Sequence, residues 1–502
     1  RKPEGIWLSE TAVDYETLEV LESLDIRFTI LSPNQALKIR LTDSHLNDKW
    51  IDVSSGNINT RMPYLCRLPN GKNITIFFYD NDISTKMSFG NILDDGEFFV
   101  KSLVNAPSGD IKLKFPDTKF PDDLICVASD GETFGHHHKF GDMALAYALD
   151  VFENKYPDTI TVFGYYLDRN KPVFEVAIKE NTSWSCSHGI CRWVEDCGCN
   201  TGSESNKGWD QKWRTPLRQA VNYLSKEAEK VYEHKIRKYI KEDIRDIWEP
   251  LYDYIFIINN RSDKNIYKFR QKFIINESLK NPENNNINLI NTFKILELYR
   301  HSMLMQSSDA WFFDDISGIE SIQVMRHACR VMELIKDITT NDFEKDFREI
   351  LKKAKSNINT YRDGQYIYDN YAKPALYSPQ KAAAFIAFEI LFKEMPHNFY
   401  SYKVSKIQSE KIIGFMTISS VITTEFFQVI FAAFNFKKKD ILSSKNASSF
   451  AEIVKNKKDD DLIKLKNKIK EIINISNIEI DEKIKNIVLA LEDFFDNKRY
   501  TL

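Results

Sequence analysis

The chain has 502 residues, enough for two or three domains with a sizeable core. Hydrophobic residues make up 43% of it and aromatic residues 13%, a composition typical of globular proteins and not of disordered ones. The 69 Lys and Arg against 72 Asp and Glu give a net charge of −3, which excludes the basic excess of a nucleic-acid-binding protein. No apolar run approaches the roughly 18 residues that predict a membrane span.

The cysteine count and the first residues indicate where the protein works. Seven cysteines are too few for a disulfide scaffold, so we expect a reducing, cytoplasmic location. The sequence opens at Arg1 without a signal-peptide pattern, and strand-like residues follow almost at once. We therefore expect it to be part of a longer protein.

The first part of the chain alternates short apolar runs with helical patterns. The first run ends near Leu8, and Asp14 is placed to cap a helix whose leucines recur on one face. Further strands are predicted at 27–31, 74–80, 124–130 and 159–163, with a helix at about 140–153. Continuous apolar runs separated by helices predict a parallel sheet covered on both faces. Residues 40–72, which carry several Gly and Asn, are expected to form an irregular insertion.

From about residue 214 the pattern changes to long helical periodicity with few glycines. Beyond the first of these helices, the pattern predicts helices over 289–305, 319–336, 380–394 and 426–436. The tail 455–502, rich in Lys and Asp, is expected to form an amphipathic helix that packs on this bundle. Two domains are therefore predicted: an α/β domain over 1–213 and an α-helical domain over 214–502.

Three predicted strands end in an acid: Glu10, Asp80 and Asp130. In parallel α/β folds the functional groups gather at the carboxyl ends of the strands. Glycoside hydrolysis needs two carboxyl groups that face one anomeric carbon, one of them protonated and the other ionised. Glu10 and Asp130 are candidates for that pair, with Trp7 as a nearby stacking face for a sugar. Helix capping or an exposed loop position is the simpler explanation of each acid.

Asp130 and Glu132 are followed closely by three consecutive histidines, His136 to His138, which raises the question of a metal site. Adjacent histidines point in different directions, so the three cannot all bind one ion, and zinc sites usually use separated ligands. We expect one of the three to face a cleft and to hydrogen-bond a substrate or a carboxylate, while the others pack or meet solvent.

Four cysteines and a histidine fall within 14 residues: Cys186, His188, Cys191, Cys197 and Cys199. This composition is typical of a zinc site, but the usual paired C-x-x-C spacing is absent. A metal-free loop with reduced thiols, presenting His188, Arg192 and Trp193 to a ligand, is the interpretation that we favour from the sequence. Structural packing is the third explanation.

Asp309 and Trp311 lie among acids and aromatics at a predicted helix boundary within 305–315. Such residues can form a helix cap over a hydrophobic staple. They can equally form one wall of a sugar site, and the residues alone do not distinguish the two.

Taken together, these motifs resemble glycoside hydrolase family 57. Residues 3–14, which contain W-L-S-E ending at Glu10, are similar to the family's W-L-P-E motif, with Ser in place of the usual Pro. Residues 129–138 resemble its D-x-E-x-F-G-H segment. Residues 306–311 resemble its Q-S-S-D-W segment, interrupted here by Ala310.

A subgroup of the family that carries a long C-terminal helical region is matched at residues 184–199, 213–218 and 313–320. The resemblance implies an α/β fold, an incomplete seven-stranded (β/α) barrel of parallel strands, followed by a mainly α-helical domain. The 300–320 region would border the active site. The family's histidine-containing first strand has no counterpart here, so we expect the first barrel strands to lie upstream of Arg1 or to be absent.

The resemblance also implies retaining chemistry, of the amylase or glucanotransferase type, on α-glucan oligosaccharides or polysaccharides. Glu10 would be the nucleophile and Asp130 the general acid/base. Substrate contacts are expected from Trp7, Asp80, Glu132, His136, His188, Arg192, Trp193, Asp309 and Trp311.

The resemblance implies neither a metal nor a cofactor, although zinc at Cys186, His188, Cys197 and Cys199 stays open. We expect no nucleic-acid or membrane partner. Two other interpretations remain: a non-catalytic glycan-binding or regulatory protein that keeps the fold, and a zinc-dependent sugar hydrolase or deacetylase on a related barrel. The sugar, its linkage, the acceptor and the oligomeric state are left open.

Overall fold

The computed structural model divides the chain into two compact units. The first unit comprises Arg1–Arg218, Ser308–Gly318 and Lys353–Arg362, and the remaining segments form the second. The structure describes residues 2–42, 50–106, 115, 118–275, 282–379, 381–383, 385–386, 398–399, 401–410, 413–434 and 440–444. Within these ranges, no helix is both long enough and apolar enough to cross a membrane.

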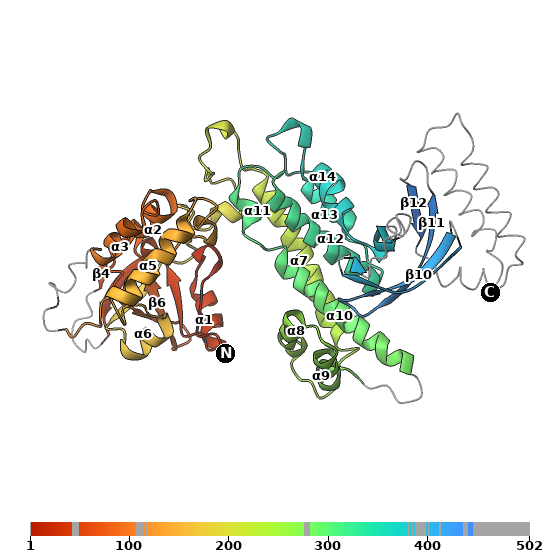
Figure 1. Ribbon diagram of the computed structural model, residues 1–502, viewed down its shortest axis with the longest axis horizontal. Helices are drawn as coiled ribbons and strands as arrows, with labels where there is room; N and C mark the ends of the chain where they lie inside the picture. The colour runs from red at the N-terminus through yellow and green to blue at the C-terminus, as the bar shows by residue number, and fades with distance from the viewer. Residues whose placement is uncertain are drawn as a thin grey trace, which may run out of the picture. The chain divides into compact units, whose positions relative to one another are not determined.

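A seven-stranded sheet forms the core of the first unit (Figure 1). Its strands are β1 (Gly5–Ile6), β2 (Phe28–Leu31), β3 (Ala36–Leu41), β4 (Ile51–Asp52), β5 (Tyr64–Arg67), β6 (Asn73–Phe78) and β7 (Phe174–Ile178). They are ordered β1-β2-β6-β5-β7-β3-β4. Strands β1, β2 and β6 run parallel, as do β5 and β7, whereas the other neighbouring pairs are antiparallel. The α/β prediction is confirmed as an incomplete barrel, but the sheet is mixed and not purely parallel.

The helices of the first unit lie beside this sheet. They are α1 (Tyr15–Ser23), α2 (Asn81–Phe89), α3 (Gly96–Val104), α5 (Gly141–Lys155) and α6 (Phe163–Arg169). Helix α11 (Asp309–Phe312) also belongs to the first unit, where it contacts the 3₁₀ turn Cys191–Trp193. Helix α1 begins as predicted, because the Asp14 carboxylate accepts a hydrogen bond from the Thr17 amide at 2.8 Å. Helices α2, α3 and α5 share one apolar cluster that includes Met87, Phe99 and Ala148 (Figure 1).

Two predicted strands of the first unit are wrong. Residues 124–130 are extended but form no ladder, because their backbone groups bond singly to neighbouring loops: the Leu124 amide to the Arg61 carbonyl at 3.0 Å, and the Asp80 amide to the Cys126 carbonyl at 2.7 Å. Residues 159–162 are likewise irregular, and α6 begins at Phe163.

The segment 40–72 is more regular than predicted. It supplies β4 and β5 to the sheet, and the Tyr64 side chain is fully buried, with its hydroxyl donating to the Asn59 carbonyl at 2.7 Å. Residues 43–49 of this segment lie outside the described part of the chain.

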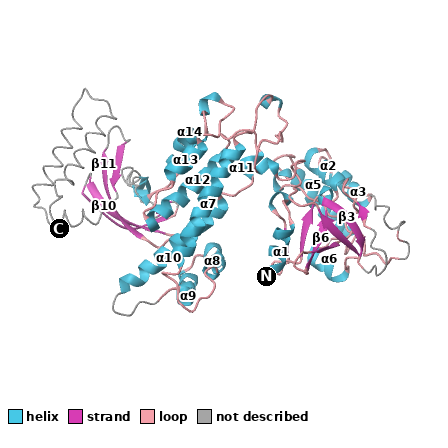
Figure 2. Ribbon diagram, turned by 180° about the vertical axis from the view of Figure 1, so that it is seen from behind, coloured by secondary structure: helices cyan, strands magenta, loops and turns pink. Residues whose placement is uncertain are grey.

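The second unit is mainly helical (Figure 2). Its helices are α7 (Arg214–Ile236, which begins in the first unit), α8 (Glu249–Asn259), α9 (Asp263–Phe273), α10 (Pro282–Leu304), α12 (Ile319–Thr339), α13 (Glu344–Leu351) and α14 (Gly364–Ile367). One of its apolar clusters combines aliphatic and aromatic residues, and the Tyr232 ring stacks there on the Trp248 ring with centroids 4.4 Å apart. Helices α10 and α12 pack against one another.

The predicted helix over 426–436 is wrong, because a second sheet occupies this part of the second unit. Its strands are β8 (Asn398–Phe399), β9 (Tyr402–Glu410), β10 (Ile413–Ser420), β11 (Phe426–Phe434) and β12 (Asp440–Ser444), all paired antiparallel in the order β12-β11-β10-β9-β8. Most of the predicted helix over 380–394 and the whole predicted tail helix over 455–502 lie outside the described residues.

Candidate active site

The carboxyl ends of three parallel strands meet at one edge of the first sheet. In the register of β1, β2 and β6, Ile6 pairs with Thr29 and Leu31 pairs with Phe78, so all three strands end at this edge. The residues that follow β1 lead to Glu10, and those that follow β6 are Tyr79 and Asp80. The sheet therefore places two of the three predicted strand-end acids at the position where α/β folds carry their sites.

Glu10 lies in a backbone conformation that side chains rarely adopt. It has φ 58° and Thr11 has φ 50°, in the left-handed region, which a β-branched threonine disfavours even more than glutamate does. Hydrogen bonds hold this turn: the Trp184 amide donates to the Glu10 carbonyl at 3.1 Å, and the Gln35 side-chain amide donates to the Thr11 carbonyl at 2.8 Å. Strain of this kind persists where the surroundings enforce it, and it is concentrated at functional sites.

The Glu10 carboxylate is held through one oxygen. The Trp184 indole N–H donates to Oε2 at 3.0 Å, and the Ser185 hydroxyl donates to the same oxygen at 2.6 Å. Within the described part of the chain, Oε1 accepts no hydrogen bond. An ionised carboxylate fixed at one oxygen and free at the other is arranged as a nucleophile needs to be.

Three aromatic rings stand beside Glu10. The Trp7 and Trp184 rings meet edge to face with centroids 5.1 Å apart, and Tyr79 lies 6.5 Å from Trp7 and 6.2 Å from Trp184. The Trp7 side chain is 41% exposed, whereas Tyr79 is buried. Trp7 therefore presents a partly exposed aromatic surface beside the Trp184 ring that holds Glu10, and its contact with a sugar stays a prediction.

Asp130 follows the extended segment 124–129. Ala128 in that segment and Trp184, which holds Glu10, pack against the same apolar cluster of the sheet. The Asp130 side chain is only partly covered and does not cap the 3₁₀ turn that follows it, Gly131–Thr133. Partial burial raises the pKa of this carboxyl, and the negative charges of Glu132 and Asp309 raise it further, whereas His137 opposes them. A carboxyl with a raised pKa is suited to act as a general acid.

The three histidines point to different partners, as expected for consecutive residues. The His138 ring nitrogen Nε2 lies 3.0 Å from the Ser88 carbonyl. His136 and His137 are exposed with ring centroids 4.8 Å apart, and His137 is the one whose charge acts on Asp130. The predicted substrate contacts of His136 and Glu132 stay predictions.

Asp80 fits the simpler explanation of a strand-end acid. Its Oδ1 accepts a hydrogen bond from the Ile83 amide at 3.0 Å and so caps α2. Its Oδ2 lies 3.4 Å from the Arg61 guanidinium. Both oxygens are thus used within the protein, and a contact of Asp80 with a substrate stays a prediction.

Comparison with known families divides the chain near the end of the sheet. Residues 1–177 match the model of glycosyl hydrolase family 57, and residues 209–502 match a domain of unknown function, DUF3536. The second match covers more than half of the chain, which therefore belongs to the DUF3536 family, and residues 1–177 are similar to glycosyl hydrolase family 57. No curated protein sequence matches it.

Among solved structures, this chain resembles an exo-type maltose-forming amylase from Pyrococcus sp. ST04, with a TM-score of 0.50 and 15% identity. The similarity covers 70% of this chain and 59% of the amylase chain, so this chain spans only part of the length of that structure. At this identity the likeness concerns the fold.

The predicted sugar contact of Trp311 is contradicted by its burial. Its side chain is fully buried, its indole N–H donates to the Arg214 carbonyl at 3.1 Å, and the Arg218 guanidinium lies 3.6 Å from its ring centre. Both the ring face and the N–H are therefore used inside the first unit. Asp309, two residues earlier, is exposed and acts on Asp130 through its charge.

The predicted contacts of Arg192 and Trp193 with a ligand are contradicted in the same way. Both side chains are buried. The Arg192 guanidinium donates to the Asn200 carbonyl at 3.1 Å and lies 4.5 Å from the Phe312 ring centre. The side chains of Arg192 and Trp193 therefore pack inside the loop 184–200 and do not face a substrate.

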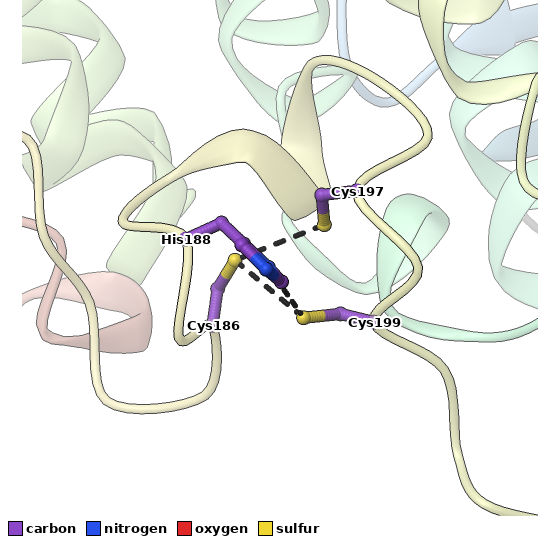
Figure 3. A group of neighbouring side chains, drawn as sticks. All are labelled: Cys186, His188, Cys197 and Cys199. Carbon is purple, nitrogen blue, oxygen red and sulfur yellow. Dashed lines mark hydrogen bonds between the residues drawn. The ribbon is translucent and has the colours of Figure 1, made fainter.

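His188 is exposed, but it points at thiols. Its Nδ1 lies 3.5 Å from the Cys199 sulfur, in a group that also contains Cys186 and Cys197 (Figure 3). Burial acts to raise the pKa of the Cys199 thiol, but hydrogen bonds with His188, Cys197 and Cys186 outweigh it and lower this pKa to about 7. These four residues could hold a metal ion.

Sequence reasoning missed the residues that hold Glu10. Trp184 and Ser185 lie 174 and 175 positions along the chain from it. Sequence reasoning also missed Tyr79, which follows β6 and whose ring lies beside those of Trp7 and Trp184. The available signal was the position of Trp184 and Ser185 directly before Cys186, in a segment already matched to the family subgroup.

Removing the Ser185 hydroxyl is expected to lower kcat/KM for a glucan by about 10- to 150-fold, because a hydrogen bond to a charged group contributes about 1.5–3 kcal/mol. Trp184→Phe, which removes only the indole donor, is expected to act in the same direction. The measurement is steady-state kinetics on maltodextrin. Ser203→Ala is the control, since Ser203 is an exposed serine near the same loop, and its hydroxyl lies 2.7 Å from that of Ser205. Full activity of Ser185→Ala would contradict this role.

Proposed function

We propose that the first unit is a retaining glycoside hydrolase or transglycosylase that acts on α-glucans by double displacement. The observation that carries the proposal is the Glu10 carboxylate, fixed by Trp184 and Ser185 through Oε2 and bordered by the exposed face of Trp7. The family 57 match of residues 1–177 supports the class of reaction.

In the first step, Oε1 of Glu10 attacks the anomeric carbon while Asp130 gives its proton to the leaving glycosidic oxygen. The bond to the leaving sugar breaks as the glycosyl ester on Glu10 forms. In the second step, Asp130 takes a proton from water or from an acceptor hydroxyl, which displaces Glu10 with a second inversion. Two carboxyl groups suffice for this chemistry, so it requires no cofactor.

The site chemistry and the comparisons together suggest the substrate. A flat aromatic surface at Trp7 suits the apolar face of a pyranose ring, and the exposed polar groups Glu132, His136 and Asp309 would bind hydroxyls. The structural neighbour is named as a maltose-forming amylase, which favours α-linked glucose. The segment Ser308–Gly318 belongs to the first unit and would border the site through Asp309.

The test is incubation of the purified chain with maltodextrin, with the anomeric configuration of new reducing ends followed by proton NMR before they mutarotate. Retaining cleavage gives the α-anomer first, and transfer would appear as longer oligosaccharides. Cellodextrin, with β-linkages, is the control and should remain intact. Initial formation of the β-anomer would overturn the double displacement, and binding of maltodextrin without any product would favour a glycan-binding protein that keeps the fold.

A further inference from the structure

The cysteine and histidine group in the loop after β7 has the arrangement of metal ligands. The ligand atoms of Cys186, His188, Cys197 and Cys199 all lie within 4.8 Å of one another. Figure 3 shows the four side chains pointing toward a common centre from two segments of one loop. The Cys186 sulfur lies 3.9 Å from that of Cys197 and 3.8 Å from that of Cys199, and His188 Nδ1 lies 3.5 Å from the Cys199 sulfur.

The spacings of these three ligand pairs match those of a tetrahedral zinc site. With Zn–S bonds of about 2.3 Å and Zn–N bonds of about 2.0–2.1 Å, tetrahedral angles place two sulfurs about 3.8 Å apart and a sulfur and a nitrogen about 3.5 Å apart. We propose that Cys186, His188, Cys197 and Cys199 bind one structural zinc ion. This differs from the metal-free loop that the sequence favoured.

Disulfide bonding is a poor account of the same group. The sulfur pairs at 3.8 and 3.9 Å are far from the about 2.05 Å of a disulfide, and one cysteine would be left over among three. The ligand pairs have spacings C-x-H and C-x-C, which is why a search for C-x-x-C does not find them. Soft thiolates with one imidazole select zinc among the common cellular cations.

Four protein ligands close the coordination sphere, so this zinc stabilises structure and leaves no position for a catalytic water. Three thiolates, a neutral imidazole and Zn²⁺ carry a net charge of −1. Two buried arginines balance that charge: the Arg214 guanidinium donates to the Cys199 carbonyl at 2.8 Å, and the Arg192 guanidinium donates to the Asn200 carbonyl. The surroundings thus favour an anionic centre.

The metal would also position the residues that hold Glu10. Trp184 and Ser185, the two donors to the Glu10 carboxylate, directly precede the ligand Cys186. At the other end of the loop, the Thr201 amide and hydroxyl donate to the Asp314 carboxylate at 2.8 and 2.6 Å. Zinc would cross-link the two segments of this loop and so fix the position of Trp184 and Ser185.

The test is zinc content of the full chain, measured by elemental analysis after purification without chelators. Wild type should carry about one zinc per chain, and Cys197→Ser and Cys199→Ser should each fall below about 0.1, because a thiolate ligand is lost. Cys191→Ser is the matched control: this fourth cysteine of the same loop lies outside the group of four ligands, and the variant should keep its zinc. Exchange for Co²⁺ should give the visible absorption of tetrahedral cobalt with thiolate ligands.

A second measurement needs no variant. Alkylation of the folded wild-type chain followed by mass spectrometry should modify Cys191, while Cys186, Cys197 and Cys199 react only after zinc is removed by a chelator. Less than about 0.1 zinc per wild-type chain, or loss of zinc in Cys191→Ser but not in Cys197→Ser, would overturn the site. Since neither measurement uses glycosidase activity, the zinc proposal and the proposed function can fail separately.

Discussion

Glu10→Gln is expected to lower kcat/KM on maltodextrin by at least about 10³-fold, since the amide cannot form the glycosyl ester and loss of a covalent nucleophile removes the main route. The hydrogen bonds from Trp184 and Ser185 to Oε2 can still form to the amide oxygen, so the fold should change little. Equal binding of maltodextrin by wild type and variant, measured by calorimetry, would separate lost chemistry from lost binding. Glu16→Gln, an exposed acid in the first turn of α1, is the control and should keep full activity.

The role of Glu10 as nucleophile has a sharper signature than loss of rate. In Glu10→Gly, azide can enter the space left by the side chain and attack an activated α-glucosyl fluoride directly. A single displacement then gives the β-glucosyl azide, inverted relative to the substrate. Formation of the α-azide, or a Glu10→Gln enzyme with near wild-type turnover, would show that another group attacks the anomeric carbon.

The sequence predicted best those features that depend on neighbours along the chain. The Asp14 cap, the buried strands β2 and β6 and the start of α12 near residue 319 follow from local patterns, and the structure contains them. Local patterns failed at β11, where F-F-Q-V-I-F-A-A-F carries apolar residues at both helical and strand spacing. The partner β10 decides the outcome, pairing Ile413 with Ala432 through Ser419 with Phe426.

In the candidate site, too, the sequence predicted features that depend on local motifs and missed those that depend on distant residues. Strand-end position and motif singled out Glu10 and Asp130, but nothing near Glu10 in the sequence reveals that Trp184 and Ser185 hold it. Burial is also a property of the whole fold, so the aromatic Trp311, which resembles a sugar-stacking residue in sequence, is packed under Arg218 instead. The zinc ligands are close along the chain, yet only their folded geometry distinguishes a metal site from a group of reduced thiols.

Asp130→Asn is expected to lower kcat/KM on maltodextrin by about 10²- to 10⁴-fold, the usual contribution of a general acid. The loss should depend on the leaving group. With a glucosyl fluoride as substrate, the fluoride ion departs without needing a proton, so the glycosyl ester should form nearly as fast as in wild type. The ester should then accumulate, because the asparagine of the variant cannot activate the water that hydrolyses it. Equal losses on maltodextrin and on the fluoride would show that Asp130 binds sugar and does not transfer a proton.

The pH profile tests the same assignment through the charges around Asp130. Burial first, and then the charges of Glu132 and Asp309, raise its pKa, so the acid stays protonated to a higher pH than an ordinary aspartate. Wild-type activity should fall as the pH rises through this pKa, and that basic limb should be absent in Asp130→Asn. Glu132→Gln and Asp309→Asn each remove a negative charge, lower the pKa of Asp130 and should move the limb to lower pH. Glu153→Gln, exposed on α5, should leave the limb in place, and a limb that persists in Asp130→Asn would assign the proton to a different group.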